Sequence, residues 1–581
     1  MSLKRRFLIP VCVAGLVIAS ATLAVRLGAQ QSGSDIPLAT IRVNTRMVLV
    51  DVVVTDKQGK PITGLKPENF VLEENGKKQK IVAFTTPDEA AKASAPTPLP
   101  PGIYSNEPQY RAEGAVTAFV LDAANTPFAD QASGRLQMLK YVATAMKPDQ
   151  RIAIYTLTNT LHMVQDFTSD PAVLTAALKK YTPQEPVLAP GAAAPISSAA
   201  GNTDSPAIAQ EVDMAAQEIN GFQSLQLAYQ LENRTVETLE AMRALGRVLG
   251  GMPGRKEIIW LTAAFPFDLI PEDRDISEAE QALLTQGIQQ TSLGTNAGGS
   301  LAAARRSAHW DEIRDAAAQM SSAQIALYPI DVRGLLSGME FASMNDLPAR
   351  QSLDTSMKAQ ARISNLSSEH ETMRQIAAET GGKAYVNQNE IKDGILSALA
   401  DNNAAYTLGY YPENKKWDGK YRSLKVKVDR DGTQVRSRKG YFAVDPTQEK
   451  EKKSDLEVAE ALRTAIPATL VSFKAQVKPQ DKGKVRVVFL VDAHTLTAED
   501  SSGNKKFNVT FYATFVANDG KIGGTRSIKV DQAFKTDVYQ QILQQGMMTP
   551  LDLDVPSGTR LVRLAVRDNS TGNVGTIDAP L

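Results

Sequence analysis

The chain is predicted to fold as an α/β protein with a doubly wound, mostly parallel sheet, flanked by smaller N-terminal and C-terminal β-sandwich-like domains. Three observations predict this class. Strand-like runs alternate with helical stretches across residues 113–402, β-branched runs with hairpin turns precede them in 38–86, and further strand-like runs follow in 461–581. At 581 residues the chain is also too long for one hydrophobic core, so several domains are expected.

The N-terminus has the pattern of a signal peptide. A basic start precedes an apolar run from Phe7 to Val25, and small residues follow at Gly28-Ala29. We expect export to the periplasm, cell surface or exterior, with cleavage of residues 1–29. An uncleaved membrane anchor is the alternative, and membrane contact is expected only in that case. The sole cysteine, Cys12, lies in this segment, so disulfides and thiolate chemistry are excluded from the mature chain.

The central region, 113–402, carries the α/β pattern. Its strand-like runs are "VTAFVLDA", "RIAIYTL", "EIIWLTA" and "QIALYPID". Asp170-Pro171 is typical of a helix start, and a helix over 232–249 ends at "GGMPG". Strands that alternate with helices indicate a parallel sheet covered on both faces. Segments 182–206 and 285–306 are rich in small and polar residues and are predicted to be flexible surface insertions.

The remaining chain is divided by composition. A small β domain over 38–86 contains the hairpin turn Asn75-Gly76. The other predicted segments are an Ala/Pro-rich linker (87–112), an aromatic-rich β extension (403–445), a charged linker (446–460) and a C-terminal β-sandwich-like domain (461–581). Tyr406, Tyr410, Tyr411, Trp417 and Tyr421 cluster in the extension, either as a carbohydrate or protein surface or, more simply, as packing.

Seven stretches taken together resemble the von Willebrand factor A-related family of exported bacterial proteins. They are "DVVVTDKQGKPITGLKPENFVLEENGKKQKIVAF", "LDAANTPFADQ", "QDFTSDPAVL", "GRKEIIWLTAAFP", "ALYPIDVRGL", "TGGKAY" and "YTLGYYP", within about residues 40–445. The resemblance implies a VWA/Rossmann-like fold with a crevice at the carboxyl ends of the strands. In the wider family that crevice holds a divalent cation through Asp-x-Ser-x-Ser, a later threonine and an aspartate after the fourth strand.

This sequence keeps only part of that pattern. Asp122 and Thr126 match the first motif, but Ala124 replaces its middle serine. After "EIIWL" no carboxylate appears before Asp268, and Thr235 is placed as the later threonine by chain order alone. The resemblance therefore implies a degenerate metal-ion-dependent adhesion site. If a metal binds, Asp122, Thr126 and Thr235 hold Mg²⁺ or Mn²⁺, the cations that prefer such oxygen ligands.

Simpler roles explain the same residues. Thr126 followed by Pro127 is typical of a helix N-cap and first turn, and Asp122 can accept backbone hydrogen bonds at a strand end. Asp331 ends a strand on the same rim, where it supplies a second carboxylate, pairs with Arg333 or caps a turn.

The functional prediction is a non-enzymatic exported protein that mediates protein–protein interaction or adhesion with an unidentified partner. The alternatives are an extracytoplasmic hydrolase that uses Asp122 as nucleophile or base, and a purely structural envelope component. The histidines His162, His309, His370 and His494 show no zinc-hydrolase spacing. A formal net charge of zero gives no support for nucleic-acid binding.

Overall fold

The structure, a computed structural model, describes residues 47–87, 99–107, 116–148, 150–184, 206–267, 310–334, 366–367, 369–388, 390–402, 404–444, 451–480, 483–501 and 504–581. All of them belong to one compact unit, Arg42–Leu581. The predicted signal segment 1–29, the insertion 285–306 and most of the insertion 182–206 lie outside the described residues. No helix in the described part is long and apolar enough to cross a membrane.

The centre of the fold is a mixed five-stranded sheet in the order β10-β9-β6-β7-β8. Its strands are β6 (Val116–Asp122), β7 (Arg151–Leu157), β8 (Leu161–Thr168), β9 (Lys256–Thr262) and β10 (Ile325–Asp331). β6, β7, β9 and β10 run parallel, and β8 is antiparallel to β7. The predicted α/β class with a mostly parallel sheet is confirmed at this level.

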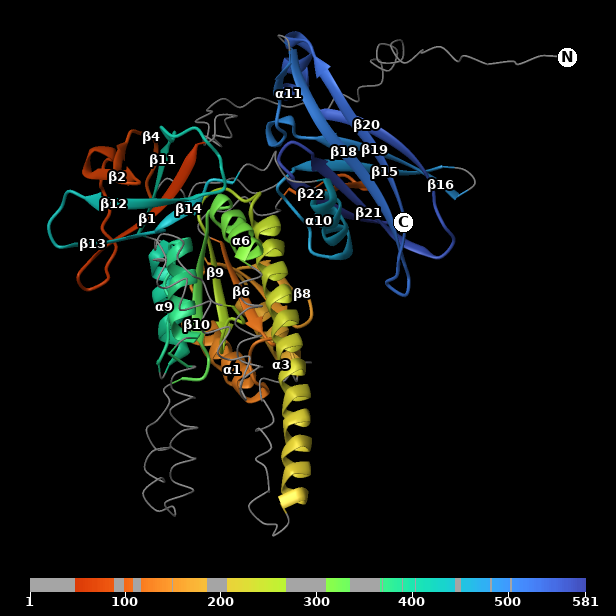
Figure 1. The fold of residues 1–581 in the computed structure, drawn as a ribbon. Helices are drawn as coiled ribbons and strands as arrows, with labels where there is room; N and C mark the ends of the chain where they lie inside the picture. The colour runs from red at the N-terminus through yellow and green to blue at the C-terminus, as the bar shows by residue number, and fades with distance from the viewer. Residues whose placement is uncertain are drawn as a thin grey trace. The chain divides into compact units, whose positions relative to one another are not determined.

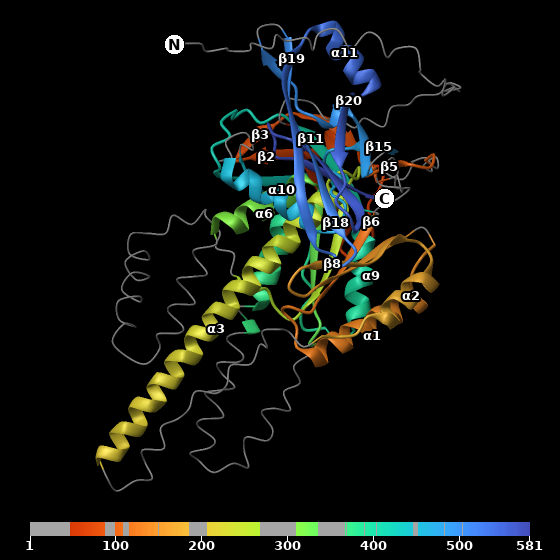
Figure 2. The same ribbon diagram turned by 90° about the vertical axis from the view of Figure 1, so that its right-hand side faces the viewer.

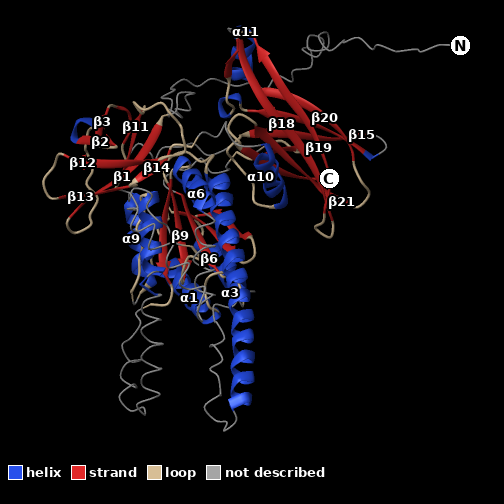
Figure 3. Cartoon of the chain, in the orientation of Figure 1, coloured by secondary structure: helices blue, strands red, loops and turns tan. Residues whose placement is uncertain are grey.

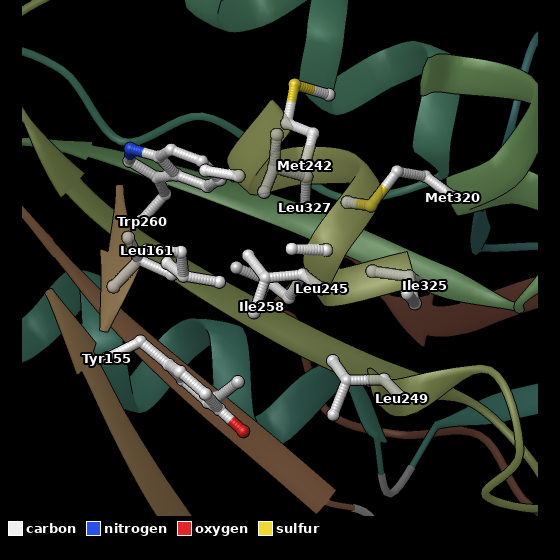
Figure 4. Close-up of a cluster of buried hydrophobic side chains, with 14 of the residues drawn as sticks. Tyr155, Leu161, Met242, Leu245, Leu249, Ile258, Trp260, Met320, Ile325 and Leu327 are labelled. Atoms are coloured by element: carbon white, nitrogen blue, oxygen red, sulfur yellow. The ribbon is translucent and has the colours of Figure 1, made fainter. Parts of the chain in front are cut away.

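Helices cover both faces of this sheet (Figures 1 and 3). One face packs on α1 (Phe128–Thr144), α2 (Pro171–Lys180) and α9 (Ile391–Asn402); the other packs on α3 (Pro206–Leu249), α6 (Trp310–Ser322) and the helical residues 369–380. Because both faces are covered, every residue of β6, β9 and β10 is buried and the strands show no polar alternation. Figure 4 shows Trp260 on one of these faces with Met242, Leu245 and Leu327.

Two predicted helix ends are reproduced in the structure. Asp170 is the N-cap of α2, and its side chain accepts a hydrogen bond from the backbone N–H of Ala172, 2.7 Å away. Pro171 occupies the first turn, where its missing N–H costs nothing. α3 ends at Leu249, directly before the glycines of "GGMPG". It begins at Pro206, well before the predicted start at residue 232, and so includes the last residue of the predicted insertion 182–206.

The regions predicted as a small β domain and a β extension contribute to the same two sheets, here called the N-terminal β module. The sheets have the orders β13-β1-β11-β4 and β14-β12-β2-β3. Their strands are β1 (Val48–Asp56), β2 (Phe70–Glu74), β3 (Lys77–Gln79), β4 (Ile81–Thr85), β11 (Ala405–Tyr410), β12 (Tyr421–Val428), β13 (Thr433–Ser437) and β14 (Gly440–Phe442), with the 3-10 helix η1 (Pro67–Asn69) before β2. Both sheets share one hydrophobic cluster. Tyr406 and Tyr410 are buried in it, so for these two aromatic residues the packing interpretation is confirmed.

The C-terminal β module takes residues from both predicted linkers. Its sheets have the orders β20-β16-β15-β5 and β17-β18-β21-β22, with β19 paired to β18. The elements are β5 (Ile103–Ser105), α10 (Glu451–Arg463), β15 (Phe473–Gln480), β16 (Lys484–Val491), η8 (Ala493–Thr495), β17 (Glu499–Ser501), β18 (Asn504–Ala517), β19 (Ile522–Phe534), α11 (Thr536–Gln545), β20 (Met547–Asp554), β21 (Thr559–Asp568) and β22 (Val574–Pro580). β5 lies in the segment predicted as an Ala/Pro-rich linker and pairs with β15. α10 begins in the segment predicted as a charged linker (446–460), extends three residues beyond it, and buries Val458, Ala461 and Leu462.

Candidate functional site

The candidate site lies where the strand order of the central sheet reverses direction. From β6 the chain passes through α1 to β7 on one side, and it reaches β9 on the other side only after α3. The loops that leave β6 and β9 therefore diverge at the carboxyl edge, which is where open α/β sheets bind ligands. Asp122 and Thr262 end the two adjacent strands, and Asp331 is in register with Thr262 on the next strand.

Asp122 is buried and hydrogen-bonded at both carboxylate oxygens. Its Oδ2 accepts from the indole Nε1 of Trp260 at 2.9 Å, and its Oδ1 accepts from the backbone N–H of Asn125 at 2.9 Å. The side-chain amide of Asn125 also lies 3.1 and 3.0 Å from the two oxygens. Burial raises the pKa of Asp122, and these hydrogen bonds oppose part of that increase. The carboxylate thus connects the loop after β6 to the buried strand β9.

Asn125 links this carboxylate to a cationic side chain on α3. Its Nδ2 donates to Thr238 Oγ1 at 2.9 Å, and its Oδ1 accepts from the Nε of Arg234 at 3.0 Å. Burial lowers the pKa of Arg234, while the nearby carboxylates of Asp122 and Glu369 oppose that decrease. The chain therefore supplies its own positive charge one side chain away from Asp122.

The two threonines predicted as metal ligands are also engaged in the protein. Thr126 Oγ1 accepts from the backbone N–H of Ala263 at 3.1 Å, which joins the loops after β6 and β9. Thr235 Oγ1 donates to Leu231 O at 2.8 Å and lies 3.0 Å from Pro266 O. The simpler interpretation of Thr126 as a helix N-cap is wrong, because α1 begins at Phe128 after the N-cap Pro127 and has no side-chain cap.

This donor set does not fit a divalent cation. Mg²⁺ and Mn²⁺ need several free oxygen ligands, and charge count sets much of their affinity. Asp122 is the only carboxylate of the predicted set, and both of its oxygens already accept N–H donors. Within the described residues, no group of three or more His, Cys, Asp and Glu side chains is placed to hold a metal. We therefore derive no chemistry at this edge from a bound cation.

Asp331 forms a second polar cluster two strands from Asp122. Its Oδ1 accepts from Arg333 Nε at 3.0 Å, and its Oδ2 lies 2.7 Å from His370 Nε2. Arg333 Nη1 also donates to Glu369 Oε2 at 2.6 Å. Burial alone would raise the pKa of Asp331, but the hydrogen bonds from His370 and Arg333 hold it below its ordinary value. The predicted ion pair with Arg333 is confirmed, and it occupies the oxygens that a second metal carboxylate would need.

Six residues of these clusters were not predicted as site residues: Asn125, Arg234, Thr238, Trp260, Glu369 and His370. Trp260 carried a usable signal, because it lies between Ile259 and Leu261 in a buried strand and its indole N–H requires a partner there. His370 carried none, since it lies 39 positions from Asp331 and matches no local motif. Arg234 lies 109 positions from Asn125, and only the placement of α3 on the sheet brings the two together.

Comparisons with known proteins give only loose structural likenesses. No family model and no curated protein matches the chain. An aerotolerance-related membrane protein from Bacteroides fragilis aligns over 49% of this chain and 98% of its own, with 12% identity and a TM-score of 0.22. The human COPII-coat protein Sec24c aligns over 66% and 53%, with 10% identity and a TM-score of 0.20. An endonuclease/exonuclease/phosphatase from Beutenbergia cavernae aligns over 31% and 38%, with 10% identity and a TM-score of 0.12. Likenesses at these scores carry no argument about function.

Proposed function

We propose that this chain is a non-enzymatic exported protein with a von Willebrand factor A-like domain, which binds a protein partner at the carboxyl edge of its central sheet. One observation carries the proposal: the buried network around Asp122 holds the loops after β6 and β9 together at the topological switch point. A rigid scaffold that fixes surface loops in this way is a common basis for binding. Export is supported by the signal-like segment 1–29.

The same network argues against Asp122 as a catalytic group. A nucleophile or base needs a free lone pair that faces the substrate, whereas both oxygens of Asp122 accept N–H donors inside the protein. The Asp331–His370 pair is a better candidate for a hydrolase, because a carboxylate that orients a histidine is the usual arrangement of a general base. A second candidate function is therefore an extracytoplasmic hydrolase that uses His370.

The proposed binding edge carries an exposed aromatic residue. Phe128 is the first residue of α1, directly after the loop that begins at Asp122, and its side chain is 47% exposed. Aromatic side chains are over-represented among the residues that dominate binding energy in protein interfaces. Leu136 lies two turns further along the same helix and is 59% exposed. The helix thus provides two exposed apolar side chains, Phe128 at the carboxyl edge and Leu136 away from it.

Partner capture with this matched pair tests the proposal. Wild type, Phe128→Ser and Leu136→Ser would be used as bait against the extracytoplasmic fraction of the producing cell, and affinity then measured for each captured protein after purification. We expect Phe128→Ser to weaken binding at least tenfold, and Leu136→Ser to leave it within about twofold. Equal affinity of both variants would contradict binding at this edge. A hydrolytic activity lost in His370→Ala but kept in Phe128→Ser would favour the second candidate.

A further inference from the structure

The N-terminal half of α3 exposes a row of large apolar side chains. The helix spans 44 residues, and its C-terminal half buries Leu239, Leu245 and Leu249 against the central sheet. Figure 2 shows the other half extending away from the strands of that sheet. Along this half Phe222 is 70% exposed, and just beyond it Tyr229 is 61% exposed. Exposed aromatic residues in a row need an explanation that scattered surface leucines do not.

The spacing of these side chains is that of a coiled coil. The positions Ile208, Ala215, Phe222, Tyr229 and Val236 recur every seven residues, and Val212 and Ile219 lie three residues before Ala215 and Phe222. In heptad notation the first five are d positions and the last two are a positions. All of them except Ala215 and Val212 are among the exposed large apolar residues. We call this set the α3 seam; its d positions span about four heptads and its apolar a positions about two.

We propose that the α3 seam pairs with the α3 seam of a second copy of this chain, in parallel, as a two-stranded coiled coil. A heptad seam is self-complementary, because knobs from one helix fit the holes of an identical helix. β-branched residues at a positions, here Val212 and Ile219, favour two-stranded pairing. Gln226 and Asn233 continue the a series, and polar residues at such positions set register at some cost in stability.

Charge favours the parallel direction over the N-terminal part of the seam. Glu211 and Glu218 occupy g positions beside the seam, and both side chains are exposed. In an antiparallel pair g positions face g positions, so these glutamates would lie opposite one another and repel. In a parallel pair each g residue faces the e residue of the next heptad, so Glu211 and Glu218 face Ala216 and Gln223, which are uncharged. The arrangement therefore penalises the antiparallel dimer along the N-terminal part of the seam, while the parallel dimer carries one like-charge contact, between Glu232 and Glu237, at the other end.

The size of the seam is sufficient for a specific but reversible dimer. Large apolar and aromatic side chains exposed to this degree leave roughly 500 Å² of apolar surface per helix. Two seams together would then bury about 1,000 Å², which is near the lower bound for specific protein–protein interfaces. We expect a concentration-dependent equilibrium. The dimer does not depend on the edge-binding function proposed above, because the seam and the Asp122 network use different residues.

Sedimentation equilibrium of the full chain tests the pairing. Phe222→Glu places a charge in the middle of the seam, while Met214→Glu makes a similar change at a c position that is 49% exposed but outside it. We expect a wild-type dimer that Phe222→Glu weakens at least 100-fold and that Met214→Glu changes less than threefold. A wild-type chain that stays monomeric at the highest concentration measured would overturn the proposal. An equal effect of both variants on the dimer would also overturn it.

Disulfide trapping tests the direction of pairing independently of stability. In a Cys12→Ser background, Phe222→Cys places identical d positions face to face in a parallel dimer, and mild oxidation should give a covalent dimer in high yield. Met214→Cys places its thiols outside the seam and should remain monomeric. Circular dichroism of each variant confirms that the fold is kept. A folded Phe222→Cys chain that does not crosslink under these conditions would rule out the parallel pairing.

Discussion

Two buried carboxylates at opposite edges of the central sheet differ in what surrounds them. Asp122 is the last residue of β6 and accepts hydrogen bonds from Trp260 and Asn125. Glu257 is the second residue of β9, at the amino edge, and neither of its oxygens accepts a hydrogen bond from an N–H donor among the described residues; the Tyr328 hydroxyl lowers its pKa only slightly. Burial raises the pKa of Glu257 to about 8, and the charge of Arg255 opposes only part of that increase.

The comparison shows that burial alone does not decide the role of an acidic side chain. With N–H donors on both oxygens, a buried carboxylate acts as a connector between loops. Without N–H donors, it retains its proton into the neutral pH range and loses it as the pH rises further. The charged neighbours of Glu257 are Arg255, Asp401 and Arg436. The two arginines lower its pKa, and Asp401 raises it. We therefore expect the carboxyl edge to be sensitive to mutation and the amino edge to be sensitive to pH.

The largest effect is expected for Asp122→Ala, which removes the carboxylate that links the loop after β6 to strand β9. The change leaves the Trp260 indole N–H and the Asn125 backbone N–H buried without an acceptor, at a cost of about 3–5 kcal/mol. Urea unfolding followed by tryptophan fluorescence measures the free energy of unfolding. Asp130→Ala, at a half-buried position on the same edge, should cost under about 0.5 kcal/mol. A loss for Asp122→Ala no larger than that of the control would show that the network does not hold the loops.

The pH sensitivity of the amino edge is tested with Glu257→Gln. The folded chain keeps this proton up to about pH 8, while the unfolded chain releases it near 4.5. Between these values the unfolded state binds fewer protons, so wild-type stability falls as pH rises through the window. Glutamine cannot lose a proton, so the variant should gain about 3 kcal/mol relative to wild type between pH 5 and pH 8. Parallel stability curves for the two proteins would contradict this, and Glu390→Gln on the surface controls for the substitution itself.

A smaller effect is expected for Trp260→Phe, which tests whether Asp122 is linked to β9 through the indole N–H of Trp260. Phenylalanine keeps most of the buried apolar surface but removes the indole N–H that Asp122 accepts. We expect a loss of about 1–2 kcal/mol and a further increase in the pKa of Asp122, because that hydrogen bond holds it down. A double-mutant cycle with Asp122→Ala should show coupling of about 1 kcal/mol. Additive losses would mean that the two side chains act independently.

The smallest effect is expected from divalent cations. Mg²⁺ or Mn²⁺ at millimolar concentration should shift the melting temperature by less than about 1 °C, because the oxygens of Asp122 already accept N–H donors. EDTA should likewise change nothing. A specific increase in melting temperature with Mn²⁺ in wild type, absent in Asp122→Ala, would restore the predicted site of Asp122, Thr126 and Thr235.

The candidate site could be predicted only in part from sequence. The motif comparison identified Asp122 and the lost serine at Ala124, since both stand in one short stretch after a strand. It could not identify Trp260, which donates to Asp122 across 138 positions. Such a partner depends on which strands become neighbours, and a motif within one loop carries no information about that.

The sequence by itself determined the α/β alternation, the buried strands and the helix start at Asp170, because each follows from local periodicity and capping. Tertiary structure decided which distant segments pair. β1 pairs with β11 and β13 more than 340 positions away, and β5 pairs with β15 across a similar gap. Short strands of this kind have little preference of their own, and burial of their apolar faces in a shared core selects the partner.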